Sequence, residues 1–170
     1  MSLEDGFAPA SDFRAVLSEQ RGRQTFTIMR GPDGQFAHCL LSRSLLVGDG
    51  GGGGMAPIPP IGDPGADSLD LAMIGAIGPS RNTAFGISLP SDPRTANYAY
   101  GRAGADVASL VLHTRSQGDV TATLQAGLWA ASWPSPDDST DFTDVTATLT
   151  LTDGSSREVD INALALPWSD

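Results

Sequence analysis

The sequence of 170 residues has no lysine, a single cysteine and only two histidines. A Walker A phosphate loop is excluded, because that motif requires a lysine followed by serine or threonine. A structural zinc site is excluded as well, since it needs four Cys or His ligands and the chain supplies three in all. Cys39 has no partner for an intramolecular disulfide, and in the apolar run from Phe36 to Leu41 its thiol is best interpreted as a small buried hydrophobe.

Positive charge is also scarce. Ten arginines face twenty acidic residues, which gives a formal net charge of −10 at pH 7. Such a surface repels nucleic-acid phosphates and anionic lipid headgroups, because binding to either needs clustered positive charge. We therefore expect no nucleic-acid partner and no direct lipid binding by this chain.

Short apolar or alternating segments, separated by Gly, Pro and Asp turns, run through most of the sequence. Thr25 to Met29 and Gln35 to Leu41 flank the turn Gly31-Pro-Asp-Gly34 and predict a β-hairpin. The pattern predicts one all-β domain over residues 1–170, an antiparallel β-sandwich. Its further strands are expected at Leu69 to Ile77, Thr83 to Leu89, Val107 to Thr114, Val120 to Gln125, Leu128 to Trp133, Val145 to Thr152 and Arg157 to Ile161.

Two segments are expected to depart from the strand pattern. Ser11 can cap a short N-terminal helix over Asp12 to Gln20, in which Phe13, Val16 and Leu17 recur at helical spacing. Residues 48–65 contain five consecutive glycines and four prolines, which predict a flexible surface loop because glycine costs backbone entropy and proline lacks a donor.

Nucleophilic catalysis finds little support in the sequence. No Gly-x-Ser-x-Gly motif is present, and His38 and Cys39 are adjacent in an expected strand, so their side chains point to opposite faces. His113 lies in another expected strand, where a neighbour or water would satisfy the ring. These features favour a non-enzymatic protein and leave enzymatic activity open.

Acidic clusters are the main candidates for a metal site. Asp137, Asp138, Asp141 and Asp144 fall within eight residues of an expected loop, and calcium is held by six to eight oxygen ligands of this kind. The spacing matches no EF-hand, so a solvated acidic loop is the simpler interpretation. No other cofactor is expected. A second, weaker cluster comprises Asp63, Asp67 and Asp70.

Aromatic residues make up only 6% of the chain. Trp129 and Trp133 are four residues apart, so at strand spacing both rings fall on the same side. Together with Trp168, Tyr98 and Tyr100 they could line a carbohydrate-binding platform. Core packing is the competing interpretation, because large aromatics normally bury most of their surface.

From Tyr100 onward, the order of features resembles a known group of domains. The stretches are Tyr100-Gly-Arg-Ala-Gly-Ala-Asp-Val107, Val120-Thr-Ala-Thr-Leu124, Gly127-Leu-Trp-Ala-Ala-Ser-Trp-Pro134 and Leu151-Thr-Asp-Gly-Ser155. They resemble the uncharacterised extracytoplasmic domains of membrane-anchored, anti-sigma-factor-like proteins from high-GC bacteria. The resemblance implies an outward-facing domain on a tether and provides no catalytic residues.

The sequence itself contains no apolar run of the roughly 18 residues that a membrane-spanning helix needs. Its abrupt start at Met1-Ser2-Leu3 is compatible with a truncated chain whose native anchor lies upstream. We therefore expect an extracytoplasmic location with a membrane tether outside this sequence.

The preferred functional hypothesis is a non-enzymatic extracytoplasmic sensing or binding domain, with a protein or a cell-envelope ligand as its partner. The alternative is a secreted carbohydrate-active or calcium-binding hydrolase-type domain that uses the Asp-rich loop. A purely structural role in an envelope assembly is the third hypothesis.

Overall fold

The computed structural model describes residues 9–22, 24–32, 35–44, 48–56, 64–77, 80–84, 87–92, 95–135 and 144–164. Within these ranges, fourteen strands are joined by turns, and helix is confined to short 3-10 turns such as Ala10–Asp12 and Asn162–Leu164. The strands are β1 (Arg14–Arg21), β2 (Gln24–Arg30), β3 (Phe36–Ser44), β4 (Gly48–Ala56), β5 (Met73–Ile77), β6 (Ser80–Ala84), β7 (Ile87–Asp92), β8 (Thr95–Arg102), β9 (Val107–Thr114), β10 (Gly118–Thr121), β11 (Thr123–Gln125), β12 (Leu128–Ser135), β13 (Thr146–Leu151) and β14 (Ser156–Asp160).

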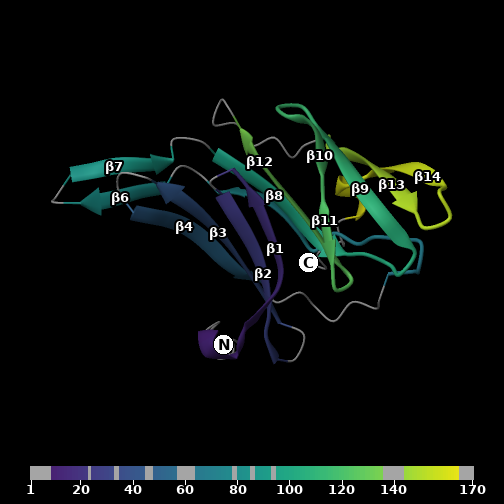
Figure 1. Cartoon of the computed structure of the whole chain (residues 1–170), viewed down its shortest axis with the longest axis horizontal. Coiled ribbons are helices and arrows are strands. Elements are labelled where there is room, and N and C mark those ends of the chain that lie inside the picture. Colours follow the sequence, from purple (N-terminus) through teal and green to yellow (C-terminus); the bar gives the residue numbers. More distant parts are fainter. Residues whose placement is uncertain are drawn as a thin grey trace.

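Three four-stranded antiparallel sheets are stacked face to face (Figure 1). The first sheet has the order β1-β2-β3-β4, the middle sheet β11-β12-β8-β5, and the third sheet β10-β9-β13-β14. A separate hairpin, β6-β7, lies against β3 and β4. The predicted all-β antiparallel sandwich is therefore confirmed, and it has three layers.

The middle sheet is buried on both faces. Along β12, Leu128 and Ala130 pack toward the first sheet, whereas Trp129, Ala131 and Trp133 pack toward the third. Successive strand residues point to opposite faces, so a strand covered on both sides needs a continuous apolar run. This requirement explains why the segment from Leu128 to Trp133 does not alternate with polar residues.

Two cores fill the spaces between the layers. The third-sheet core joins the middle and third sheets through Leu69, Leu71, Ala99, Leu110, Leu112, Val120, Ala122, Trp129, Ala131, Trp133, Val145, Ala147, Leu149 and Ile161. The first-sheet core joins the first and middle sheets through Leu17, Phe26, Ile28, Phe36, Leu40, Ala96, Tyr98, Tyr100, Leu128 and Ala130.

One predicted strand, Val120 to Gln125, is divided between two sheets. β10 pairs with β9 in the third sheet, and β11 pairs with β12 in the middle sheet. Ala122 lies at the crossing point and donates its backbone N–H to the Leu110 carbonyl at 2.8 Å. The two-residue turn after β11 places Ala126 and Gly127 at φ values of 53° and 73°, as a type I′ hairpin turn requires.

The predicted N-terminal helix over Asp12 to Gln20 is wrong, because this segment forms β1. Its register with β2 pairs Ala15 with Met29 and Leu17 with Ile28, so Val16 is an extra residue in a β-bulge. The bulge interrupts the two-residue alternation, so Val16 and Leu17 both pack against the first-sheet core, and two consecutive apolar residues also fit a helix. Beyond it, Leu17 and Glu19 are buried and Ser18 is exposed, as in a strand.

The predicted flexible loop at residues 48–65 is wrong for its first half. Gly48–Ala56 is strand β4, paired with β3 from Ser44 opposite Gly48 to Phe36 opposite Ala56. The ladder of backbone hydrogen bonds holds the glycines in an extended conformation despite their poor strand propensity. Residues 57–63 lie outside the described part of the chain.

Most of the remaining strand predictions are confirmed within a few residues. Val107–Thr114 is β9 with the predicted bounds, and β2 and β3 form the predicted hairpin. The prediction was less accurate between Leu69 and Leu89. There Leu69 makes only an isolated bridge, and the expected strand from Thr83 to Leu89 falls across two strands, β6 and β7. The segment Gly78-Pro-Ser-Arg-Asn82 has the residue types of a turn, but its last three residues belong to β6 and pair with β7.

Candidate functional site

The outward face of the third sheet carries polar side chains on all four of its strands. Alternation turns Leu110, Leu112, Ala147 and Leu149 inward, where each is 0% exposed. We call the outward surface the polar face. It comprises Ser109, Val111 and His113 of β9, Asp119 and Thr121 of β10, Thr146, Thr148 and Thr150 of β13, and Ser156, Glu158 and Asp160 of β14.

Strand register arranges these residues in rows across the sheet. The first row runs through residues 119, 113, 146 and 160, and the second through residues 121, 111, 148 and 158. Thr148 therefore lies directly opposite Glu158 and diagonal to His113. Side chains paired in this way lie close enough to bind one ligand together.

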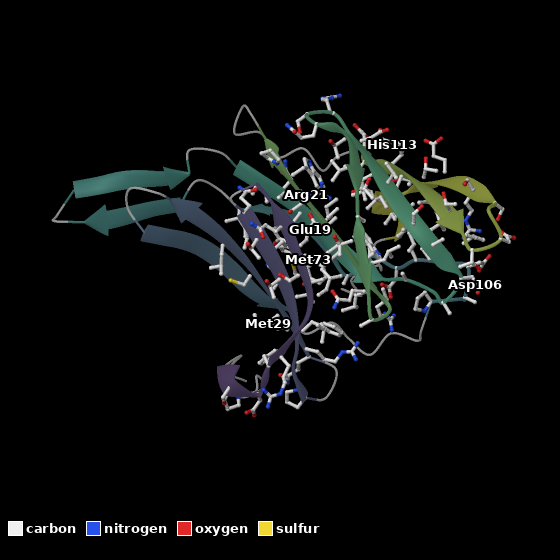
Figure 2. All side chains as sticks on the ribbon, viewed as in Figure 1. Glu19, Arg21, Met29, Met73, Asp106 and His113 are labelled. Atoms are coloured by element: carbon white, nitrogen blue, oxygen red, sulfur yellow. The ribbon has the colours of Figure 1, made fainter. Side chains whose placement is uncertain are left out.

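His113 forms the centre of a hydrogen-bonded chain on this face. Its Nδ1 lies 2.8 Å from Asp119 Oδ1, and its Nε2 lies 2.8 Å from Thr148 Oγ1. The three residues come from β10, β9 and β13. The side chains of His113 and Asp119 are 38% and 74% exposed, so the chain is open to solvent. Figure 2 shows His113 on the third sheet and Glu19 and Arg21 on the first.

A second polar arrangement lies between the first and middle sheets. Glu19 of β1 is 4% exposed, and its Oε1 accepts hydrogen bonds from the Ser132 N–H and hydroxyl, both at 3.0 Å. Arg21 also donates to Glu19 Oε1, and it donates to the Thr121 carbonyl of β10. These bonds connect all three sheets, which indicates a structural role for the pair.

Buried aromatic rings surround His38 in the first-sheet core. Its Nδ1 lies 3.2 Å from the Tyr100 hydroxyl, and its ring centroid lies 4.9 Å from that of Tyr98. Burial lowers the pKa of His38 and raises the pKa values of Tyr98 and Tyr100. These groups therefore stay neutral near pH 7. Cys39 lies on the opposite side of β3 from the His38 ring, as expected, but it is half-buried and not the fully buried residue that the apolar run predicted.

The two tryptophans predicted as weak ligand-binding candidates are core residues. Trp129 is 0% exposed and Trp133 is 1% exposed, both in the third-sheet core. Their rings do share one face of β12, as strand spacing predicts. Trp129 donates its indole N–H to the Asp70 carbonyl at 2.9 Å. An exposed carbohydrate platform of these two rings is therefore not formed, and core packing is the correct interpretation. Trp168 lies outside the described residues.

The Asp-rich loop proposed for calcium falls largely outside the described residues, which include Asp144 but not Asp137, Asp138 or Asp141. Asp144 is exposed and has a φ of 66°. The calcium hypothesis therefore remains a prediction. In the described ranges, no group of three or more His, Cys, Asp or Glu side chains is arranged to hold a metal ion.

Two aspartates of the weaker acidic cluster are paired with arginines. Asp70 accepts bonds from the Arg102 backbone N–H and Nε, both at 2.6 Å. Asp67 Oδ2 lies 3.6 Å from Arg157 Nη1. Both carboxylates are thus engaged in ion pairs, and Asp63 lies outside the described residues.

Sequence reasoning identified His113 as a strand residue satisfied by a neighbour, but it did not identify Asp119 or Thr148. Asp119 follows His113 by six residues across a turn, so strand pairing brings the two side chains together. That pairing could have been inferred from the turn at Ser116-Gln-Gly-Asp119. Thr148 belongs to a strand 35 residues away, and the sequence does not specify which strands are neighbours.

Comparison with known proteins provides no relative from which a function could be transferred. The chain matches no protein-family model, and searches of curated proteins and of solved structures return no significant match. Among the described residues, no helix is long and apolar enough to cross a membrane. A functional assignment must therefore be argued from the residues of the chain itself.

Proposed function

We propose that the protein is a non-enzymatic extracytoplasmic binding domain that recognises a cell-envelope ligand through the polar face. The observation that carries the proposal is the solvent-open chain of Asp119, His113 and Thr148 at the centre of a regular polar surface. Hydroxyl, imidazole and carboxylate groups on neighbouring strands supply directional hydrogen bonds for a polar ligand.

Catalysis by the same three groups is disfavoured by the position of β13. An acyl-transfer enzyme needs N–H donors aimed at the developing oxyanion beside its nucleophile. β13 is an interior strand that pairs with β9 on one side and β14 on the other. The backbone N–H groups around Thr148 are therefore engaged in the sheet ladder, so they do not form an oxyanion hole. Binding fits this surface better than covalent chemistry.

The proposed location rests on the resemblance to tethered extracytoplasmic domains. An acidic surface suits a domain that must remain clear of an anionic membrane, because like charges repel. The location is tested by sequencing the native reading frame upstream of Leu3. A hydrophobic segment of about 20 residues with basic residues on its cytoplasmic side supports a tether. A native start at this position would contradict it.

The binding proposal is tested by pull-down and calorimetry against isolated cell-envelope fractions and purified envelope proteins. His113→Gln and Thr148→Val should reduce the captured amount, because each breaks the hydrogen-bonded chain. A matched control is the Ser18–Thr27 pair on the outward face of the first sheet, whose hydroxyls lie 3.2 Å apart. Binding that is lost equally with Ser18→Ala and Thr27→Val would refute a specific role for the polar face.

A further inference from the structure

We infer that the polar face selects an amine-bearing polyhydroxylated ligand, of the amino-sugar class, whose ammonium group binds beside Thr148 and Glu158. This inference rests on the proposed binding function and specifies its ligand. It follows from the direction of the hydrogen bonds around His113 and from the sign of the charges in the neighbouring rows.

When the imidazole of His113 is neutral, its two partners fix the direction of its hydrogen bonds. An ionised carboxylate can only accept, so Asp119 requires a proton on His113 Nδ1. The other nitrogen of the neutral ring, Nε2, is then an acceptor. Thr148 must donate its hydroxyl proton to Nε2, across 2.8 Å. Both lone pairs of Thr148 Oγ1 are consequently free of this bond, and the group acts as an acceptor toward a ligand.

Negative charge adjoins this acceptor. Glu158 is exposed and lies directly opposite Thr148 in the β13–β14 pair. Residues paired in this way have Cβ atoms about 5 Å apart. A single ammonium group can therefore contact both the hydroxyl and the carboxylate, and a charge-assisted bond of this kind is stronger than a neutral one.

The remainder of the face excludes anions and suits hydroxyl groups. Asp119 and Asp160 end the first row, and no outward position of the four strands, as described, carries an arginine. Thr146 and Thr150 flank Thr148 on its own strand and add groups that both donate and accept. A ligand that combines an amine with several hydroxyl groups matches this pattern, whereas a phosphate or carboxylate ligand would meet repulsion.

The test is calorimetric titration of the full chain at pH 7 with two sets of oligosaccharides of equal length. One set is made of glucosamine and carries free amines, and the other is its fully N-acetylated counterpart. Binding should be at least about tenfold tighter for the amine form, because acetylation removes the charge that Glu158 attracts. Thr148→Val and Glu158→Gln should each weaken binding of the amine form by about tenfold.

Thr27→Val is the matched control, since it makes the same substitution on the outward face of the first sheet. Equal binding of both oligosaccharides, lost with Thr148→Val, would overturn the amine specificity and leave the proposed binding face intact. Amine-form binding that is unchanged in Thr148→Val and Glu158→Gln would also overturn the inference, because the amine would then bind elsewhere. If neither oligosaccharide binds, the ligand class is wrong, and envelope capture sensitive to His113→Gln would still support the binding function.

Discussion

The two faces of the middle sheet pack against cores of different chemistry. Toward the third sheet, the clustered side chains are aliphatic apart from Trp129 and Trp133. Toward the first sheet, Tyr98 and Tyr100 pack against Phe26 and His38, with ring centroids 4.9 to 5.9 Å apart. The same two strands, β8 and β12, supply residues to both cores, and alternation along β8 turns Tyr98 and Tyr100 toward the first sheet and Ala99 toward the third.

The sheets that cover the middle layer add to this difference. β9 and β13 present leucine and alanine inward, whereas β1 and β3 present Glu19 and His38 as well as apolar residues. A core built almost entirely of apolar side chains depends chiefly on volume and packing. A core that contains polar groups also depends on every donor and acceptor being satisfied. The third-sheet core should therefore respond chiefly to cavities, and the first-sheet core to lost hydrogen bonds and to pH.

Trp129→Ala should have the largest effect on stability. The side chain is fully buried in the third-sheet core, and truncating a buried tryptophan to alanine costs about 3 to 5 kcal/mol. Urea denaturation of the wild-type and variant chains measures this loss. Trp129→Phe retains much of the volume but removes the bond to the Asp70 carbonyl, so a smaller loss of about 1 to 2 kcal/mol is expected. Equal losses in both variants would contradict a volume-dependent core.

Ser132→Ala should have a smaller effect, in the first-sheet core. The change creates little cavity but removes one of the three donors to the buried Glu19 carboxylate. Loss of a hydrogen bond to a buried charged group costs about 1 to 3 kcal/mol. Ser18→Ala, at an exposed position of β1, provides the control and should change the free energy of unfolding by less than about 0.5 kcal/mol. Indistinguishable urea curves for the two variants would show that the Glu19 cluster contributes nothing.

Strands that depend on local residue patterns could be predicted from sequence, whereas strands that depend on pairing with another segment could not. β9 and the β2–β3 hairpin depend on local alternation and turn residues, and both were predicted. β1 could not be recognised, because the bulge at Val16 gives its apolar residues a helical spacing. The glycines of β4 carry no side-chain pattern at all, so only pairing with β3 reveals the strand.

The candidate site was predictable in part for a similar reason. Alternation places His113 and Thr148 on outward faces, and the sequence shows both patterns. The neighbouring positions of β9 and β13 depend on packing of the third-sheet core, in which Leu110 and Leu112 meet Ala147 and Leu149. Contacts between strands so distant in sequence arise from the tertiary fold, which a single sequence does not encode in any local signal.

Acidification should affect the first-sheet core through His38. Burial lowers the pKa of this imidazole below its ordinary value of 6.5, so the unfolded chain binds the proton more readily than the folded chain. The contribution of His38 to stability is therefore complete above pH 6.5 and is lost as the pH falls through the folded-state pKa. Urea denaturation between pH 7.5 and pH 5, in steps of about half a pH unit, should show this decline.

His38→Phe is the matched variant for the pH experiment, since it keeps an aromatic ring among Phe26, Tyr98 and Tyr100 but cannot be protonated. Other titrating groups contribute to both chains alike. The decline in the free energy of unfolding should therefore be shallower in the variant, whatever its stability at pH 7.5. Parallel curves for the two chains would show that His38 is not the group responsible.

The smallest effect on stability is expected for a substitution on the outward surface of the third sheet. Strand β13 allows an outward and an inward position to be compared directly. Thr148→Val alters a half-exposed position, and surface substitutions of this kind usually change the free energy of unfolding by less than about 0.5 kcal/mol. Ala147, its buried neighbour, is 0% exposed, and Ala147→Val would overfill the third-sheet core at a cost of about 1 to 3 kcal/mol. Thermal and urea denaturation of both variants measures the difference.

In ligand binding, Thr148→Val should have a larger effect than Ala147→Val, the reverse of their order in stability. Because Thr148 and Asp119 contact opposite nitrogens of His113, Thr148→Val and Asp119→Asn should be energetically coupled in ligand binding although no bond joins them directly. Groups that share one hydrogen-bond network typically couple by about 0.5 to 3 kcal/mol in a double-mutant cycle. A coupling of zero would mean that the imidazole does not transmit the orientation of its proton to Thr148, and the polar face would then act as a set of independent hydroxyl and carboxylate groups.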